Sequence, residues 1–215
     1  MKIKKLGHCC FVAEPKEGVF IMTDPGGFSL GNGQEEVTQI SAVLITHEHG
    51  DHLHIESLKK ILKNNPDATV ITNSSVGKLL DEAGIPYKTI EDGQYVEIKG
   101  VTIKGFGNIH AEIYEEMGRV QNTGYMIESL CYPGDAFEDP KEDRIDILAL
   151  PVVGPWMRMK DALLYAQKLK PRITFPVHDG FINELGAFIS KWPETVLPPV
   201  GIKFKKLELG KVEDL

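Results

Sequence analysis

A cluster of histidines and acidic residues at the end of one apolar segment constrains this chain more than any other feature. Residues 40–46 (ISAVLIT) are continuously apolar or β-branched, as is typical of a strand buried on both faces. The next residues, 47–52, read HEHGDH. With 7 His and 12 Asp in 215 residues, only about 4 × 10⁻⁴ accidental matches to H-x-H-x-D-H are expected. The motif therefore indicates a dedicated site at the end of this strand.

Imidazole and carboxylate groups at this spacing predict a site for two divalent metal ions. A strand ending in a tight loop can turn His47 and His49 toward one ion while Asp51 and His52 reach a second. Gly50 is expected to allow the backbone bend between the two pairs. This ligand chemistry favours Zn²⁺, with Mn²⁺ and Fe²⁺ as alternatives.

One loop cannot complete two metal sites, so further ligands should lie at other strand ends. His110, Asp135 and His178 each follow a predicted strand. Asp135 is the candidate whose carboxylate could bridge the two ions.

The pattern of predicted elements indicates an α/β fold. Strands are expected at residues 2–6, 9–13, 19–23, 40–46, 69–72, 95–98, 101–106, 124–127, 130–132, 145–150 and 172–175, and helices at 55–62, 74–83, 161–169 and 181–190. Ser74 or Ser75 is the expected N-cap of the second helix. A run of strands followed by alternating strands and helices occurs twice, before and after Gly100. A single domain over residues 1–215, made of two similar halves, is the simplest interpretation.

Composition narrows the compartment and the partners. There are 24 basic and 31 acidic residues, a net charge of −7, which argues against nucleic acid as a partner. Cys9, Cys10 and Cys131 are too few for a disulfide framework and suit reduced thiols in the cytoplasm. The chain shows neither a signal-peptide pattern nor 18 consecutive apolar residues, so no membrane association is expected.

On these motifs the chain resembles the metallo-β-lactamase superfamily, and more narrowly the small hydrolases that include the L-ascorbate-6-phosphate lactonases. The segments that carry the resemblance are Gly7-His8, Cys10-Phe11, Thr23-Asp24-Pro25, residues 46–52 (THEHGDH), His110, Gly134-Asp135, residues 145–152 (IDILALPV) and residues 176–178 (PVH). The resemblance implies a four-layer αβ/βα sandwich with a dinuclear metal site at one edge of its two sheets.

The resemblance also implies a role for each site residue. His47, His49 and His110 match the ligands of the first metal, Asp51, His52 and His178 match those of the second, Asp135 matches the bridge, and Asp24 matches an aspartate that supports the metal loop. A hydroxide bridging the two ions would attack the substrate, and Asp51 would orient it and pass its proton on.

Three further residues are candidates for substrate contact, each with a structural alternative. His8 could contact the substrate or only satisfy a nearby backbone group, and His54 could line the pocket or only begin a helix. Arg158 could bind an anionic group beside a helix N-terminus, although the neighbouring Trp156 and methionines could simply pack against the sheet.

The leading interpretation is a zinc-dependent hydrolase that cleaves an ester, lactone or phosphoester bond in a small anionic metabolite. His49 argues against the redox di-iron relatives, which place a glutamate there, and Asp135 argues against true β-lactamases, which use a cysteine. Two alternatives stay open: a phosphodiesterase or nuclease acting on nucleotides or RNA ends, and a metal-binding protein without catalysis.

Overall fold

Strands from along the whole chain build two seven-stranded sheets that pack face to face, in a computed structural model that describes residues 1–142, 144–183 and 185–215. The first sheet has the order β14 (Val212–Asp214), β1 (Lys2–Gly7), β2 (Cys10–Lys16), β3 (Val19–Thr23), β4 (Ile40–Leu44), β5 (Thr69–Thr72) and β6 (Tyr87–Thr89). The second has the order β13 (Lys203–Phe204), β12 (Ile173–Val177), β11 (Ile147–Pro151), β10 (Leu130–Tyr132), β9 (Gly124–Ile127), β8 (Val101–Phe106) and β7 (Tyr95–Ile98). The chain passes from one sheet to the other between β6 and β7, and β14 returns to pair with β1.

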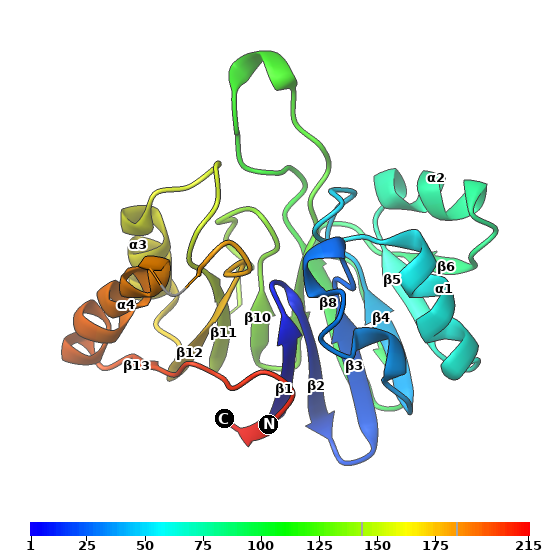
Figure 1. Ribbon diagram of the computed structural model, residues 1–215, viewed down its shortest axis with the longest axis horizontal. Helices are drawn as coiled ribbons and strands as arrows, with labels where there is room; N and C mark the ends of the chain where they lie inside the picture. The colour runs from blue at the N-terminus through cyan, green and yellow to red at the C-terminus, as the bar shows by residue number, and fades with distance from the viewer. Residues whose placement is uncertain (143, 184) are drawn as a thin grey trace.

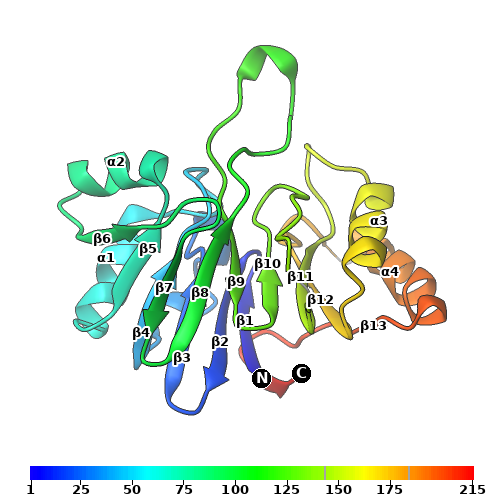
Figure 2. The same ribbon diagram turned by 180° about the vertical axis from the view of Figure 1, so that it is seen from behind.

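In the described residues, four α-helices cover the outer faces of the two sheets (Figures 1 and 2). They are α1 (Ile55–Asn64) and α2 (Ser74–Glu82) on the first sheet, and α3 (Met159–Leu169) and α4 (Lys191–Val196) on the second. Within the described parts of the chain, every helix is too short or too polar to span a bilayer.

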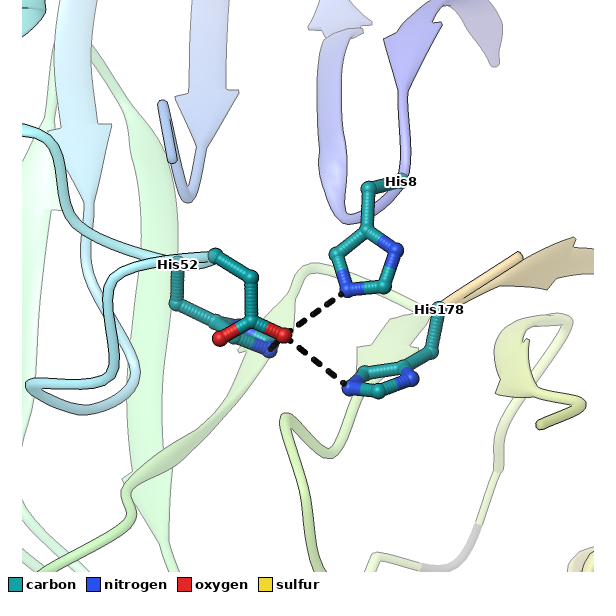
Figure 3. A group of neighbouring side chains, drawn as sticks. His8, His52 and His178 are labelled. Carbon is teal, nitrogen blue, oxygen red and sulfur yellow. Dashed lines mark hydrogen bonds and ion pairs between the residues drawn. The ribbon is translucent and has the colours of Figure 1, made fainter. Parts of the chain in front are cut away.

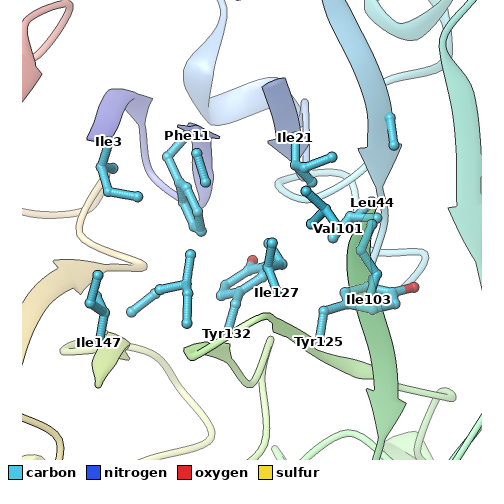
Figure 4. Close-up of a cluster of buried hydrophobic side chains, with 14 of the residues drawn as sticks. Ile3, Phe11, Ile21, Leu44, Val101, Ile103, Tyr125, Ile127, Tyr132 and Ile147 are labelled. Carbon is cyan, nitrogen blue, oxygen red and sulfur yellow. The ribbon is translucent and has the colours of Figure 1, made fainter. Parts of the chain in front are cut away.

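Three hydrophobic clusters separate these four layers. The cluster between the sheets includes Phe11 and Tyr132 (Figure 4), whose rings meet edge-on at a centroid distance of 5.4 Å. Phe11 is also edge-on to Phe175, at 5.3 Å. A second cluster joins the first sheet to Leu58 of α1. A third joins the second sheet to Ala162 of α3. The predicted four-layer αβ/βα sandwich is confirmed.

Strand β4 shows why the segment before the histidine motif is apolar throughout. Ala42 and Leu44 face the cluster between the sheets, whereas Val43 and Ile45 face the cluster under the helices. Both faces of the strand are therefore buried, as the uninterrupted apolar run predicts.

Two local predictions are wrong. The N-cap of α2 is Asn73, whose side chain accepts from Val76 N, and neither Ser74 nor Ser75 takes that role. The helix expected at 181–190, a range that includes residue 184 outside the described chain, is instead a 3₁₀ helix at Leu185–Ser190 followed by α4. The Asn183 side chain accepts from Gly186 N, a bond of the kind that begins a helix, so the helical segment begins at Leu185 and not at residue 181.

The loop that carries the motif, residues 47–52 and called the metal loop below, packs against Gly26, a glycine outside the motif. Gly50 does not have a positive φ and a Cβ there would meet nothing, so the expectation that Gly50 enables the bend is wrong. A Cβ on Gly26, by contrast, would lie 1.8 Å from the backbone oxygen of Asp51. Gly27 N donates to Gly50 O at 2.7 Å, so the segment after β3 packs directly on the metal loop.

We expect Gly26→Ala to destabilise the protein by about 2 kcal/mol or more, because the added methyl group forces the metal loop away from the segment after β3. Gly50→Ala, in the same loop, should change the unfolding free energy by less than about 0.5 kcal/mol. Urea unfolding in the presence of EDTA measures both values without a contribution from bound metal. Equal destabilisation by the two variants would show that the close contact between Gly26 and the backbone of Asp51 does not cause the loss of stability.

Candidate metal centre

The predicted ligands meet at one edge of the sandwich because strands β1, β3 and β4 of one sheet and β8, β10, β11 and β12 of the other all end there. The segment between β8 and β9 projects beyond this edge (Figure 1). Functional side chains of open α/β sheets gather at the carboxyl ends of parallel strands, and this chain follows that rule.

The first group of candidate ligands consists of His47, His49 and His110. Their ligand atoms all lie within 4.8 Å of one another. His47 and His110 are buried and His49 is partly exposed. The three side chains come from two loops, after β4 and after β8.

The second group consists of Asp51, His52 and His178, joined by His8 (Figure 3). Asp51 Oδ2 lies 3.8 Å from His52 Nε2 and 3.6 Å from His178 Nε2. It lies closer, at 3.1 Å, to His8 Nε2. The motif thus contributes residues to both groups.

Asp135 lies between the two groups. Its Oδ2 is 3.4 Å from His110 Nε2 and 2.8 Å from His178 Nε2. Its Oδ1 is 3.2 Å from His52 Nε2. A single carboxylate therefore contacts candidate ligands of both groups, which is the position that a bridging ligand would need.

The hydrogen bonds of the outer ring nitrogens leave the inner nitrogens free to bind a cation. Nδ1 of His52 donates to Asp24 Oδ2 at 2.6 Å, while Nδ1 of His110 and of His178 donate to the carbonyl oxygens of Ala111 and Val153. In the neutral rings the proton then sits on Nδ1, and Nε2 presents its lone pair. The Nε2 atoms of these three residues, and Asp135 Oδ1, have no hydrogen-bond partner within the described chain. When the rings are neutral, these buried acceptors face other acceptors, which is unfavourable unless a proton or a metal cation lies between them. The side chains therefore fit a metal site.

Asp24 fixes the base of the metal loop from a fully buried position. Its Oδ1 accepts from Thr46 N at 2.8 Å, and its Oδ2 accepts from the Thr46 hydroxyl at 2.7 Å and from the Tyr132 hydroxyl. Together with the bond from His52, these contacts hold the carboxylate under the loop. Asp24 therefore lies where a supporting residue is expected.

Charge and burial set the protonation states of the metal-free site. Burial alone would raise the pKa of Asp51, but the hydrogen bond from His8 and the charge of His52 outweigh it and lower the pKa to about 2. Burial would lower the pKa of His52, but the carboxylate of Asp135 raises it well above its usual value. A metal binding at His52 must therefore displace a proton. Burial lowers the pKa of His8, which favours its neutral form.

Cys9 also lies next to the second group of candidate ligands. The Cys9 sulfur is within 4.8 Å of ligand atoms of His52 and Asp135. Burial raises the pKa of the Cys9 thiol to about 11, so the sulfur stays protonated at neutral pH and packs as part of the core. All three cysteines are free and buried.

The other predicted site residues lie outside the cavity. His54 is the N-cap of α1, and its Nδ1 accepts from Ser57 N at 3.2 Å. Arg158 has an 81% exposed side chain whose Nε and NH2 groups each donate to Asp161 at 3.0 Å. Neither residue lines the cavity beside the two groups of candidate ligands, which is described next.

A cavity of about 370 Å³ lies beside the candidate ligands, and sequence patterns did not point to Phe28 and Phe181 in its wall. Its lining residues are Phe28, His49, Gly50, Asp51, His110, Ile113, Asp135, Pro155, Trp156, His178 and Phe181. Phe28 and Phe181 are each 50% exposed and meet edge to face at 5.2 Å. The only signal in the sequence was their closeness to Asp24 and His178, which periodicity does not register.

Comparison with known proteins agrees with this geometry. The profile of the beta-lactamase superfamily domain matches residues 2–178. The chain belongs to the metallo-β-lactamase superfamily. Most of the chain, including every candidate ligand, falls within the match.

Superfamily relatives resemble this chain over most of their length. A Mycobacterium tuberculosis protein, Rv0786c, is 31% identical over 188 residues, 85% of each chain. A UPF0173 metal-dependent hydrolase from Thermoplasma volcanium is 30% identical over 189 residues, 83% of each chain. The metallo-β-lactamase fold protein YhfI from Bacillus subtilis is 14% identical with a TM-score of 0.72, covering 99% of this chain and 98% of the other. The narrower resemblance to L-ascorbate-6-phosphate lactonases stays a prediction.

We expect Asp24→Asn to weaken metal binding at the second group by about 10- to 100-fold, because the amide no longer fixes the His52 ring as the carboxylate does. Tyr132→Phe, which removes a single donor to Asp24, should weaken it less than Asp24→Asn. Competition with a chromophoric chelator measures both affinities, and circular dichroism checks the fold. Wild-type affinity in folded Asp24→Asn would show that the buried carboxylate does not orient the ligand.

Proposed function

We propose that this protein is a metal-dependent hydrolase that uses two divalent metal ions, with zinc first and manganese or iron as alternatives. The observation that carries the proposal is the pair of ligand groups, His47, His49 and His110 with Asp51, His52 and His178, joined by Asp135. Two cations held there would supply a hydroxide at neutral pH and positive charge for an oxyanion. The ester, lactone or phosphoester bond of a small anionic metabolite is the proposed substrate.

Asp51 is the residue proposed to handle a proton. Its side chain is 18% exposed and lines the cavity, and its pKa of about 2 keeps the carboxylate ionised at neutral pH. An ionised carboxylate at this position can accept a hydrogen bond from a water molecule and so orient it, and its low pKa makes it release any proton that it takes up. No side chain needs to act as a nucleophile in this scheme.

The cavity walls suggest what lies next to the scissile bond. Apolar side chains lie beside the two groups of candidate ligands, chiefly Phe28, Phe181, Trp156 and Ile113. The described lining includes no Lys or Arg, so the negative charge of a substrate would be balanced by the metals themselves. We therefore propose an anionic substrate that carries an apolar group beside the bond to be cleaved.

The buried, reduced state of all three cysteines fits the cytoplasm, where we propose the protein acts. Nucleic acid stays a weaker proposal as a partner, because the net charge is −7 and no Lys or Arg lines the cavity in the described chain.

The test is metal-dependent turnover. We expect the metal-free protein to be inactive and reconstitution to bind two ions and restore hydrolysis of bis-p-nitrophenyl phosphate or of a member of a lactone panel. Asp135→Ala should lose about 100-fold in kcat/KM, because it removes the proposed bridge. Binding of two ions without turnover of any ester would favour the non-catalytic metal-binding protein. Full occupancy of both sites in Asp135→Ala would contradict the bridging role.

The proposed apolar group of the substrate predicts that removing Phe28 and Phe181 affects some esters more than others. In Phe28→Ala/Phe181→Ala, kcat/KM for aryl or long-chain esters should fall about 30-fold, since each of the two lost aromatic contacts costs about 1 kcal/mol. The smallest ester should be affected much less. Leu30→Ala, an exposed position outside the lining, is the matched control. An equal loss for all esters would show that these rings do not select the substrate.

A further inference from the structure

His8 lies in the tight turn between β1 and β2 and points into the second ligand group (Figure 3). Its φ is +21°, a conformation uncommon for a residue with a side chain, and the residue is 1% exposed. Its ring packs against Phe28, His178 and Phe181 at centroid distances of 5.3, 4.2 and 5.4 Å. A buried ring in an unusual backbone conformation is held there by its surroundings.

The loop after β12 clamps His8 at two points. His178 N donates to the backbone oxygen of His8 at 3.1 Å, and Gly180 N donates to His8 Nδ1 at 3.0 Å. Gly180 itself has no room for a side chain, because a Cβ there would lie 2.8 Å from His8 Nδ1. The position of the ring and the absence of a side chain at 180 therefore depend on each other.

The Gly180 contact determines which ring nitrogen carries the hydrogen. A backbone N–H can only donate, so His8 Nδ1 must present its lone pair to it. In the neutral ring the hydrogen is then on Nε2, which lies 3.1 Å from Asp51 Oδ2. That contact is a hydrogen bond donated by His8 to the carboxylate.

His8 thus has the opposite polarity to its neighbours. In their neutral forms His52 and His178 carry the hydrogen on Nδ1 and offer the Nε2 lone pair, whereas neutral His8 offers Nε2–H. Although His8 lies within 4.8 Å of three candidate ligands, its inward nitrogen has no lone pair for a metal. Distance alone would count His8 as a fourth ligand, and the hydrogen-bond directions exclude it.

We propose that His8 is a positioning residue that does not bind metal: its Nε2–H group holds Asp51 Oδ2 toward His52 and His178, so that this oxygen is presented to the second metal. The inference rests on the proposed function, because it requires a metal at that group. It also gives the turn between β1 and β2 a role in the site. The oxygen that His8 holds keeps a second lone pair for the ion.

Two substitutions separate the two hydrogen bonds of the ring. In His8→Asn the side-chain oxygen can still accept from Gly180 N, but nothing reaches Asp51. In His8→Gln the amide NH₂ can reach the position of Nε2 and donate to Asp51, but the bond from Gly180 is lost. We expect His8→Asn to weaken binding of the second metal by about 10- to 100-fold and His8→Gln to stay within about threefold of the wild type.

The readout is the dissociation constant of each zinc ion, measured by chelator competition on the full chain with thermal unfolding as a check of the fold. Equal loss of the second zinc in both variants would overturn the proposal in favour of direct ligation by His8. Wild-type affinity in both variants would overturn it as well, by showing that Asp51 needs no partner. If the wild-type chain binds no second zinc, the proposed function fails first, and the two failures are distinguishable.

Gly180→Ala gives an independent test that touches no ligand. The added methyl group should displace the His8 ring and weaken the second zinc as His8→Asn does. Gly186→Ala, whose Cβ would have its nearest neighbours at 3.7 Å, is the control in the same segment. Unchanged zinc binding in Gly180→Ala would show that the contact between Gly180 and the His8 ring does not position Asp51.

Nitrogen-15 NMR of the zinc-loaded wild-type protein tests the proposal without a substitution. We expect the His8 ring to show a hydrogen on Nε2 and none on Nδ1, with His52 and His178 showing the reverse. A His8 ring without a hydrogen on Nε2 would overturn the proposal.

Discussion

A single buried carboxylate, that of Asp24, connects the parts on which the site depends. It lies at the end of β3 and accepts hydrogen bonds from the backbone and hydroxyl of Thr46, from the ring of His52 and from the Tyr132 hydroxyl of the opposite sheet. A buried carboxyl group is unfavourable unless its oxygen atoms accept hydrogen bonds, and here donors from both sheets supply them. The strand ends of the two sheets and the metal loop are therefore tied to one group.

Hydrogen-bond acceptors also determine the chemistry at the edge of the sandwich where the candidate ligands meet. Supporting acceptors take the outer hydrogens of the rings of His52, His110 and His178, so the inner nitrogens of the neutral rings face one another and Asp135 as acceptors. Such an arrangement is unfavourable as an empty cavity and favourable around cations. Folding energy from the sandwich core thus holds in place a group of side chains that would otherwise move apart.

His8 adds a donor to a site made of acceptors. Its orientation is set by a backbone N–H of Gly180, on a loop far away in sequence, and not by any feature of the motif that contains Asp51. The aromatic wall of Phe28 and Phe181 packs against the same ring. Ligand geometry, cavity shape and the turn between β1 and β2 are therefore coupled through one imidazole.

Much of this protein was predictable from local pattern. The apolar run of β4, the strands at 69–72, 95–98, 101–106 and 124–127, and the fold class follow from periodicity and burial, which are properties of short segments. The H-x-H-x-D-H motif indicated metal chemistry because few other sites require those residue types at that spacing. Tertiary structure decided the rest: that Gly26 and not Gly50 is the glycine the loop requires, that Arg158 pairs with Asp161 on the surface, and that Gly180 orients His8. These outcomes depend on atoms that meet only after the two sheets have packed, and a linear pattern carries no information about the direction of a hydrogen bond between distant loops.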